Sequence, residues 1–474
     1  KLYPLLSVLF LIVGWGQEIE WIQSYGGTGN EYGESGQQTL DGGFIVLGQT
    51  NSDSEEYNDI LLIKIDIDGN QEWSKTFSFG SDEYGYSVQQ TTDDGYVIVG
   101  NIWNEGTFLL KTDSDGNEVW TQVFDEDEYG KYFNSVQQTS DGGYIILGNS
   151  GSFSNLYMFL LKTNSEGQEE WVQYFSEGDN GLGIYFLNYS VKQTLDGGYI
   201  LLTTKDTNGI NTGGGYDVFL LKVDSEGIEQ WSNTFGMDDN DEIGRSVLQT
   251  LDSGFIFTGS IDNSVWLVKT DEYGNELWSQ SNYTENSSQG NYVYQTEDGG
   301  YILTGNDYSS SSTSDLLVIK TDINGNEEWS IIYGNGHSFG VQGNVGQSLT
   351  DGDYIVIGTE WFMFGDKDVV LVKISSDVSI VNIPIEPSVY SLNKPYPNPF
   401  NPSTTLEFSI PFSDNVNIRV LDIVGREVDI IMNQYLTDGN HTIEWNGQEH
   451  PSGIYFISFE SGGFVQTRKV VLIK

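Results

Sequence analysis

The chain has 474 residues, a formal net charge of −49, 57 glycines, 14% aromatic residues and no cysteine. An excess of negative charge on this scale repels phosphate groups and argues against binding to nucleic acids or anionic membranes. The absence of cysteine excludes disulfides, thiolate metal sites and thiol catalysis. The glycine and aromatic content is typical of strands and turns, so an all-β protein is expected.

The first 16 residues have the pattern of a secretory signal peptide. Lys1 is followed by an apolar run over residues 5–13 and by a small-residue exit that ends at Gly16. A basic start, a short apolar core and small residues mark a cleaved leader, and the run is too short to span a bilayer. The sequence therefore predicts an exported protein.

A ten-residue segment, Ser-Val-Gln-Gln-Thr-Ser-Asp-Gly-Gly-Tyr at positions 135–144, recurs along the chain. Seven copies begin at Ser35, Ser87, Ser135, Ser190, Ser246, Tyr292 and Val345. Each repeat contains four expected strands and two glycine-containing turns; in the second repeat the strands cover residues 87–91, 96–99, 108–112 and 119–124. Such a repeat forms one antiparallel sheet. Because a single small sheet leaves apolar faces uncovered, the repeats are expected to stack radially as a propeller.

Seven tryptophans occupy the last strand of successive units: Trp21, Trp73, Trp120, Trp171, Trp231, Trp278 and Trp329. The first precedes the first Asp-Gly copy, and the last Asp-Gly copy is not followed by a tryptophan of this series. Residues 18–21 thus have the sequence of an outer strand with no sheet of their own. We expect them to pair with the last repeat, which closes a seven-bladed β-propeller over residues 17–383 and leaves no free edge.

The order of strand, Asp-Gly turn and Trp strand resembles the blades of WD-repeat and quinoprotein-type propellers. It is more similar to the repeat propellers of exported bacterial proteins, whose blades read Ser-Val-x-x-Thr-x-Asp-Gly-Gly-Tyr-Ile. The resemblance covers roughly residues 17–378. It implies the fold and says almost nothing about activity.

Two polar series recur at fixed places in the repeat. A lysine in the third strand can form an anion-binding ring, or it can span the sheet interface to a turn aspartate, the interpretation favoured for a buried charge. The lysines are Lys64, Lys111, Lys162, Lys222, Lys269, Lys320 and Lys373. A glutamine series is expected to form an internal hydrogen-bond ladder. Its members are Gln38, Gln90, Gln138, Gln193, Gln249 and Gln295.

The Asp-x-x-Gly-Asn-x-x-Trp pattern, first found at residues 66–73, invites comparison with three kinds of site. The Asp box of sialidases has other offsets and needs an arginine cluster, whereas Arg245 is the one arginine of the propeller region. Nothing in the sequence supplies a shell for a quinone cofactor. A calcium loop needs further oxygen ligands, and the second aspartate is replaced in later repeats. No cofactor is therefore predicted, with calcium at one or two turns as an open alternative.

Binding residues are expected where the repeats differ. The Asp-Gly and Gly-Asn turns are uniform and share one face, while the loops after the second and fourth strands vary and share the other. Aromatic residues on this variable-loop face predict a platform for sugars, with the alternative that they fold back over the ring. The candidate ligand-binding residues are Trp103, Tyr185, Phe186, Trp361, Phe362 and Phe364. No catalytic residue and no metal ligand is assigned.

The composition changes near Pro384. Residues 384–402 are rich in proline, which predicts a stiff linker, and residues 403–474 alternate as strands of a small immunoglobulin-like β-sandwich. Four motifs stand out: Tyr-Pro-Asn-Pro-Phe-Asn-Pro at 396–402, Leu-Asp-Ile-Val-Gly-Arg-Glu-Val at 421–428, Ser-Gly-Ile-Tyr-Phe at 452–456 and Thr-Arg-Lys-Val-Val-Leu-Ile-Lys at 467–474. Together they resemble the type A sorting domain of type IX secretion substrates. The resemblance implies recognition by the outer-membrane secretion machinery and a secreted or cell-surface location.

The expected function is that of an exported, non-catalytic propeller that binds a polysaccharide or a protein across its variable-loop face. The alternative is a secreted carbohydrate-active hydrolase or lyase that uses an acidic pair in the central funnel. A spacer without a ligand is a third hypothesis. Acidic residues are so numerous that the sequence does not select such a pair.

Overall fold

The computed structural model divides the chain into two compact units, Lys1–Ser379 and Ile380–Lys474. It describes residues 12–13, 19–52, 57–125, 131–152, 155–175, 186–206, 215–236, 241–281, 283–284, 286–310, 313–334, 338–349, 351–362, 366–375, 391–392, 394–410, 414–436, 439–461 and 464–474. These residues form 36 strands and no helix, so the predicted all-β class is confirmed. Accordingly, no membrane-spanning helix is found among them. The predicted leader lies outside them, except for Ile12–Val13 (β1), and stays a prediction.

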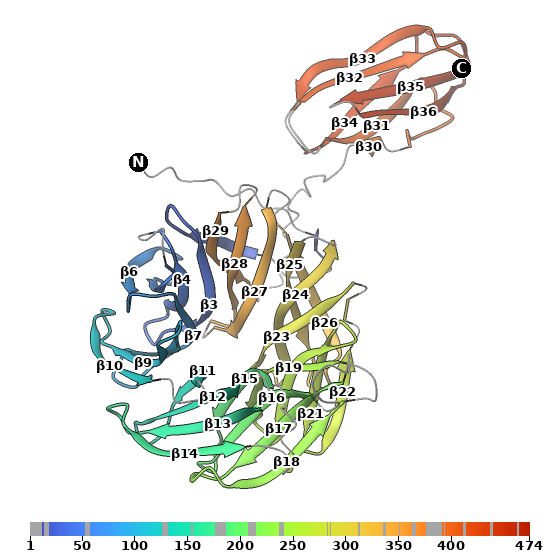
Figure 1. The fold of residues 1–474 in the computed structure, drawn as a ribbon. Coiled ribbons are helices and arrows are strands. Elements are labelled where there is room, and N and C mark those ends of the chain that lie inside the picture. The colour runs from blue at the N-terminus through green and yellow to red at the C-terminus, as the bar shows by residue number, and fades with distance from the viewer. Residues whose placement is uncertain are drawn as a thin grey trace. The chain divides into compact units, whose positions relative to one another are not determined.

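The described part of the first unit contains seven antiparallel sheets, numbered here 1 to 7 in chain order (Figure 1). Sheet 1 consists of β3 (Glu31–Gln38), β4 (Phe44–Thr50), β5 (Asp59–Ile65) and β6 (Gln71–Phe77). Sheet 2 consists of β7 (Glu83–Gln90), β8 (Tyr96–Ile102), β9 (Gly106–Thr112) and β10 (Glu118–Asp125). Sheet 3 consists of β11 (Lys131–Gln138), β12 (Tyr144–Ser152), β13 (Asn155–Thr163) and β14 (Glu169–Phe175). Sheet 4 consists of β15 (Phe186–Gln193), β16 (Tyr199–Asp206), β17 (Tyr216–Val223) and β18 (Glu229–Phe235). Sheet 5 consists of β19 (Glu242–Gln249), β20 (Phe255–Ile261), β21 (Ser264–Thr270) and β22 (Glu276–Ser281).

The last two sheets take in strands from the start of the chain. Sheet 6 consists of β23 (Ser288–Gln295), β24 (Tyr301–Ser310), β25 (Thr313–Thr321) and β26 (Glu327–Tyr333), to which β1 is added. Sheet 7 consists of β27 (Ser338–Ser348), β28 (Tyr354–Phe362), β29 (Lys367–Ile374) and β2 (Ile19–Tyr25). In sheet 7, β2 runs antiparallel to β29, with Trp21 opposite Lys373. The predicted pairing of the N-terminal strand with the last repeat is therefore confirmed.

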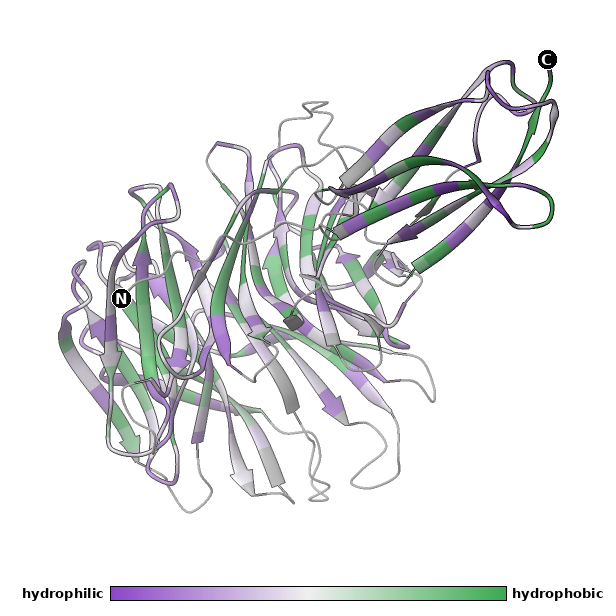
Figure 2. Ribbon diagram, turned by 90° about the horizontal axis from the view of Figure 1, so that it is seen from above, coloured by the Kyte–Doolittle hydropathy of each residue, from purple (hydrophilic) through white to green (hydrophobic). Residues whose placement is uncertain are grey.

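Hydrophobic side chains fill the spaces between consecutive sheets. The second and third strands are buried on both faces, as in β4 and β5. The first strands are only partly buried and lie innermost in Figure 1, whereas the fourth strands lie outermost. Each sheet contacts the next, and sheet 7 contacts sheet 1 where β27, β28 and β29 meet β3. Figure 2 shows hydrophobic residues, in green, along these strands.

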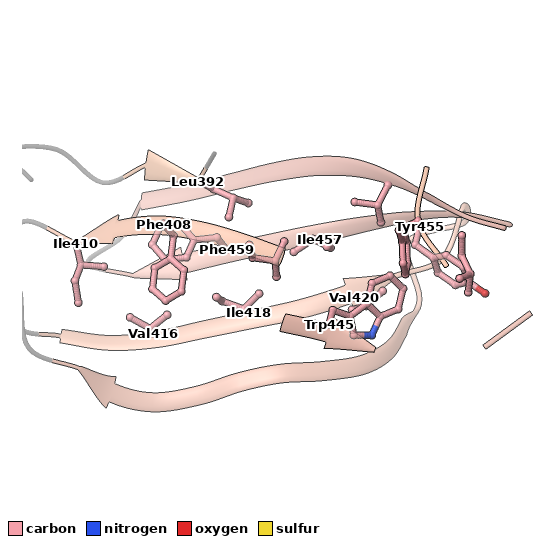
Figure 3. Packing of buried hydrophobic residues seen from close by; sticks show 14 residues of the cluster. Leu392, Phe408, Ile410, Val416, Ile418, Val420, Trp445, Tyr455, Ile457 and Phe459 are labelled. Carbon is pink, nitrogen blue, oxygen red and sulfur yellow. The ribbon is translucent and has the colours of Figure 1, made fainter. Parts of the chain in front are cut away.

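The second unit consists of two sheets that enclose one core. One sheet has the order β30 (Ser391–Leu392), β31 (Ser403–Ile410) and β34 (Gly439–Asn446). The other has the order β33 (Glu427–Leu436), β32 (Asp414–Leu421), β35 (Gly453–Ser461) and β36 (Phe464–Leu472). Figure 3 shows the core between them, where the rings of Phe408 and Phe459 lie 5.3 Å apart and Trp445 packs on Tyr455.

The second unit begins earlier than the predicted boundary at residue 403. Phe400, placed by the sequence in the linker, is buried, and its N–H donates to the Val471 carbonyl at 2.9 Å. Its carbonyl in turn accepts from the Ile473 N–H at 3.0 Å. The proline-rich segment therefore forms backbone bonds with the last strand and with the residue that follows it.

Candidate functional site

The seven repeated lysines are buried and paired. Each Nζ lies 2.8–3.3 Å from the aspartate of the Asp-Gly turn in its own sheet. Lys320, for example, contacts Asp298 and Glu328 at 2.8 Å each and donates to the Thr321 carbonyl at 2.9 Å. The predicted aspartate partner is confirmed, but the pair lies within one sheet rather than across an interface. Because each charge is matched locally, the lysines hold the turn rather than a ligand.

Replacing Lys320 by methionine is expected to lower the free energy of unfolding by about 2–3 kcal/mol, because the Thr321 carbonyl loses its donor and two carboxylates lose their cation. Urea unfolding followed by tryptophan fluorescence measures the change. Lys75→Met is the matched control, since Lys75 bonds only an exposed turn amide, that of Asn117. Its expected change is within about 0.5 kcal/mol. Equal losses in the two variants would contradict the role given to Lys320.

The glutamine series joins neighbouring sheets. Gln90 Oε1 in sheet 2 accepts from the Leu40 N–H in sheet 1 at 2.8 Å. The same bond recurs at Gln138, Gln193, Gln249 and Gln295. Each of these five amides thus caps a turn of the preceding sheet, so the predicted internal ladder is confirmed for them.

The Asp-x-x-Gly-Asn turn binds its own backbone. Asp113 Oδ1 accepts from the N–H groups of Asp115 at 3.0 Å and Asn117 at 2.8 Å, and Oδ2 accepts from Asn117 Nδ2 at 3.0 Å. These bonds lower the pKa of Asp113. Trp73 of the preceding sheet covers the turn, since a Cβ built on Gly116 would lie 2.6 Å from the indole. In the described part of the chain no group of three or more acidic or histidine side chains is placed to hold a metal ion. The hydrogen bonds that the aspartate makes within the turn therefore explain why it recurs in the repeats.

A β-bulge interrupts the first strand of each sheet in the described residues. In β3 the register shifts between Gly33 and Ser35, so Glu34 is the extra residue. The equivalent bulge residues are Tyr86, Asn134, Arg245, Asn291 and Asn344, whereas in sheet 4 the bulge lies one residue earlier, at Asn188. A bulge redirects a side chain, and bulges are frequent beside functional sites.

These bulges surround a common centre. The first strands contact one another in order from β3 to β27, and β27 contacts β3. Six bulge side chains are described, and we call them the axial ring: Glu34, Tyr86, Asn134, Arg245, Asn291 and Asn344. Tyr86 is 37% exposed, and the other five are partly buried.

Several axial-ring side chains are anchored on the following sheet. Asn291 Nδ2 donates to the Gly343 carbonyl at 2.8 Å, and Asn344 Nδ2 donates to the Gly33 carbonyl at 2.6 Å. Arg245 Nη2 donates to a side-chain amide oxygen of the next sheet at 2.9 Å. Glu34 differs, because burial raises the pKa of its carboxyl to about 7.

The structure describes half of the predicted aromatic residues. Tyr185 and Phe364 lie outside the described residues, and Phe186 begins β15 with its side chain undescribed. Phe362 ends β28 and is partly buried. The structure therefore gives no evidence that Tyr185, Phe186, Phe362 and Phe364 belong to one binding surface.

Trp103 and Trp361 lie on different sheets. Trp103 is 59% exposed in the turn after β8, and its N–H donates to the Asp82 carbonyl at 2.9 Å. Trp361 lies near the end of β28 in sheet 7. Sheet 1 separates sheets 2 and 7, so a ligand that contacts both tryptophans has to extend across it.

Trp361 belongs to a small aromatic and cationic group, which we call the rim cluster: Tyr32, Trp361 and Lys367. Lys367 Nζ lies 4.3 Å from the Tyr32 ring centre and 4.8 Å from the Trp361 ring centre. It also donates to Tyr32 Oη at 3.1 Å. All three side chains are partly exposed. Cations at these distances are attracted by the aromatic faces, so the cluster is held together.

In the described residues, pairs of carboxyl groups lie at three sheet junctions, each between the third strand of one sheet and the first strand of the next; the glutamate of each pair is buried, and two of the aspartates are partly buried. Glu83 is fully buried, and its Oε1 accepts from the N–H groups of Phe79 at 3.0 Å and Ser81 at 3.1 Å. Burial raises the pKa of Glu83 to about 7, and the neighbouring Asp59 adds to the rise. We call such contacts junction pairs: Asp59–Glu83, Asp217–Glu242 and Asp368–Glu31.

The third junction pair lies beneath the rim cluster. Burial raises the pKa of Asp368 to about 6, with further contributions from Glu31, Glu360 and Asp366. Glu360 is buried opposite Asp368 in the β28–β29 ladder, and its Oε2 accepts from Ser24 Oγ at 2.9 Å. Three carboxyl groups are therefore close together at the junction between sheets 7 and 1.

The sequence reasoning missed both the axial ring and the junction pairs. The signal for the ring was available, because the residue just before the repeated serine is the one that varies in an otherwise uniform segment. The pairs also leave a pattern, because each glutamate lies four residues before the repeated serine and each aspartate lies five residues before the repeated lysine. The pattern does not show that the two meet, since the partners come from different sheets.

The family comparison concerns the second unit. Residues 394–474 match the model of the secretion system C-terminal sorting domain. The C-terminal region is a sorting domain. Such domains mark proteins exported by the type IX system, so this protein is secreted or placed at the cell surface, as predicted. The sorting domain also implies an interaction with the secretion machinery. A comparison with curated proteins found no match.

Several solved structures resemble the chain at low identity. A protein of unknown function from Dyadobacter fermentans is 9% identical, with 76% of this chain and 99% of that chain covered and a TM-score of 0.47. An α-L-arabinanase of Penicillium chrysogenum complexed with arabinobiose is 11% identical, with 74% and 94% covered and a TM-score of 0.39. Sqt1 of Chaetomium thermophilum is 11% identical, with 97% and 100% covered and a TM-score of 0.41. Likenesses of this degree carry no argument about activity.

Proposed function

We propose that the first unit is a seven-bladed β-propeller closed by β2, which serves outside the cell as a non-catalytic binding module for a polysaccharide or a protein. We infer further that the sorting domain is an immunoglobulin-like sandwich and that residues 1–16 are a leader. The propeller is supported by the sequential contacts of the seven sheets and by the contact of sheet 7 with sheet 1. Its relation to WD-repeat, quinoprotein or exported bacterial propellers remains a proposal.

The observation that carries the binding function is the rim cluster. At the uniform turns, the repeated lysines, glutamines and aspartates have partners within the protein. At the variable-loop edge, Tyr32, Trp361 and Lys367 form a partly exposed group that the other repeats lack. Trp361 Nε1 is buried, and no described residue accepts its hydrogen bond. A partly exposed aromatic group beside a cation suits a ligand that offers an apolar face, as a sugar does.

Catalysis by an acidic pair at the centre is less well supported. Hydrolysis of glycosides requires two carboxyl groups roughly 5–10 Å apart on either side of the scissile bond. In the described axial ring Glu34 is the one carboxylate, and the other members are tyrosine, asparagine and arginine. The junction pairs are buried between sheets, as the full burial of Glu83 shows. These observations favour binding over turnover.

The variant Trp361→Ala is expected to bind its polysaccharide at least ten times more weakly than the unmodified protein, because stacking on the indole is lost. A glycan array with the full exported chain identifies a polysaccharide, and titration calorimetry then measures its affinity. Leu195→Ala is the matched control, since Leu195 is an equally apolar, 85% exposed residue at a uniform turn. Unchanged affinity in Trp361→Ala would argue against the rim cluster. Release of reducing sugar during the titration would favour the enzyme instead.

A further inference from the structure

We infer that the axial ring is a binding site for an uncharged oligosaccharide, such as the end of a neutral polysaccharide chain. The inference rests on the proposed binding function and gives it a second site and a ligand class. It starts from the bulge that the first strand carries at the same position in six of the seven described sheets.

The repeat constrains the residue after the bulge rather than the bulge residue itself. Ser35 Oγ accepts from the Val88 N–H of the next sheet at 3.3 Å. The same bond, at 3.3–3.4 Å, recurs at Ser87, Ser135, Ser190 and Ser246. Packing thus accounts for the repeated serine. The neighbouring bulge position holds glutamate, tyrosine, asparagine or arginine in different sheets, and this variety is typical of contacts with an asymmetric ligand.

The side-chain amides of Asn291 and Asn344 are held in one orientation before a ligand binds. Asn291 and Asn344 use Nδ2 to bond backbone carbonyls of the next sheet, at 2.8 and 2.6 Å. In the residues that the structure describes, the hydrogen bonds of these two amides involve the nitrogen only. Their Oδ1 atoms are therefore held in place as acceptors, and sugar hydroxyl groups are donors that match them. Fixing these side chains before binding reduces the entropy lost when a ligand is bound.

Charge favours a neutral ligand. The axial ring contains one acid, Glu34 in sheet 1, and one base, Arg245 in sheet 5, within a chain of net charge −49. An anionic glycan is repelled by the protein as a whole, and the amides and arginine offer little to a cation. Burial raises the pKa of Glu34 to about 7, so its carboxyl is partly neutral near that pH and can donate as well as accept.

An aromatic face completes the site. Tyr86 is 37% exposed. Partial burial of its phenol raises the pKa of Tyr86, and the neighbouring Glu34 adds to the rise, which places the two side chains near each other. Tyrosine rings stack on the apolar faces of sugars while the polar groups nearby bond the hydroxyls. Tyr32 of the rim cluster lies two residues before Glu34 in β3. A longer chain can therefore continue from the axial ring toward the rim cluster.

The test uses the full exported chain and an array of neutral and uronate-containing oligosaccharides of two to six sugars. We expect neutral members to bind. Calorimetry with the best of them is expected to show at least a tenfold weaker affinity for the double variant Asn291→Ala/Asn344→Ala and a two- to fivefold weaker affinity for Tyr86→Ala, which removes the stacking ring. Asn326→Ala, which removes an amide from a uniform turn, is the control and is expected to bind normally.

A purely structural role for the amides is tested by the melting temperature. Should the double variant unfold more readily than the control, Asn134→Ala replaces it, because within the described residues Asn134 bonds Tyr132 and Asn149 of its own sheet. Unchanged affinity in both the Asn134 and Tyr86 variants overturns the inference. Loss of short-oligosaccharide binding in Trp361→Ala alone also overturns it, while leaving the proposed binding function in place. Binding of uronate members only, or of none, overturns it as well.

Discussion

A chain that begins at Gly26, and so lacks β2, is expected to lose at least about 5 kcal/mol of its free energy of unfolding. The strand buries Ile19 and Tyr25, each worth roughly 2 kcal/mol, and supplies Glu20, which pairs with Lys373 at 2.9 Å. Its loss also leaves β29 as an unpaired edge, which invites aggregation. Since whole domains are stable by only about 5–15 kcal/mol, the effect is close to global unfolding.

Calorimetric melting and size-exclusion chromatography measure this outcome. A chain that begins at Gln17 keeps β2 and serves as the control, with an expected melting temperature equal to that of the full chain. A synthetic peptide of residues 17–27 is expected to restore the melting temperature of the shortened chain, because it can pair with β29 in trans. A shortened chain that is as stable as the control would refute closure by β2.

The repeated sheets could be predicted because the same sequence pattern occurs seven times. The Asp-Gly turn, the glycine-containing second turn and the Trp strand fix the strand order, and the surplus Trp21 indicates the partner of β29. Strand β33 (Glu427–Leu436) has no such repeated signal. Its apolar residues do not alternate, since Ile430 is 52% exposed while Ile431 and Met432 pack on the core.

The candidate site was less predictable, because contacts between sheets leave little trace in one sequence. Trp361 and Lys367 are neighbours in sheet 7, but Tyr32, the third member of the rim cluster, comes from the other end of the unit. Phe400 shows the same limit for the domain boundary, since only its bonds to the last strand place it inside the second unit. The aromatic composition predicts that aromatic residues contribute to the binding site, but it does not predict which of them come into contact in the fold.

The variant Glu83→Gln is expected to raise the free energy of unfolding at pH 8 by about 1–3 kcal/mol. The pKa of Glu83 is about 7 in the folded protein, against about 4.3 for an unfolded glutamate. The folded state therefore binds the proton more tightly, so this group's contribution to stability is complete below pH 4.3 and is lost as the pH rises through 7. Glutamine carries no charge and can donate to Asp59 while its oxygen still accepts from Phe79 and Ser81.

Urea unfolding of the variant and the unmodified protein at pH 5 and pH 8 tests this linkage. The difference between the two proteins is expected to be small at pH 5 and to grow toward pH 8. Glu105→Gln is the matched control, because it removes one negative charge from an exposed turn of the same sheet. If the control gained as much at pH 8, the effect would come from the net charge of −49 and not from the junction pair. A gain confined to Glu83→Gln identifies the junction between sheets 1 and 2 as a place where the fold loses stability at neutral pH.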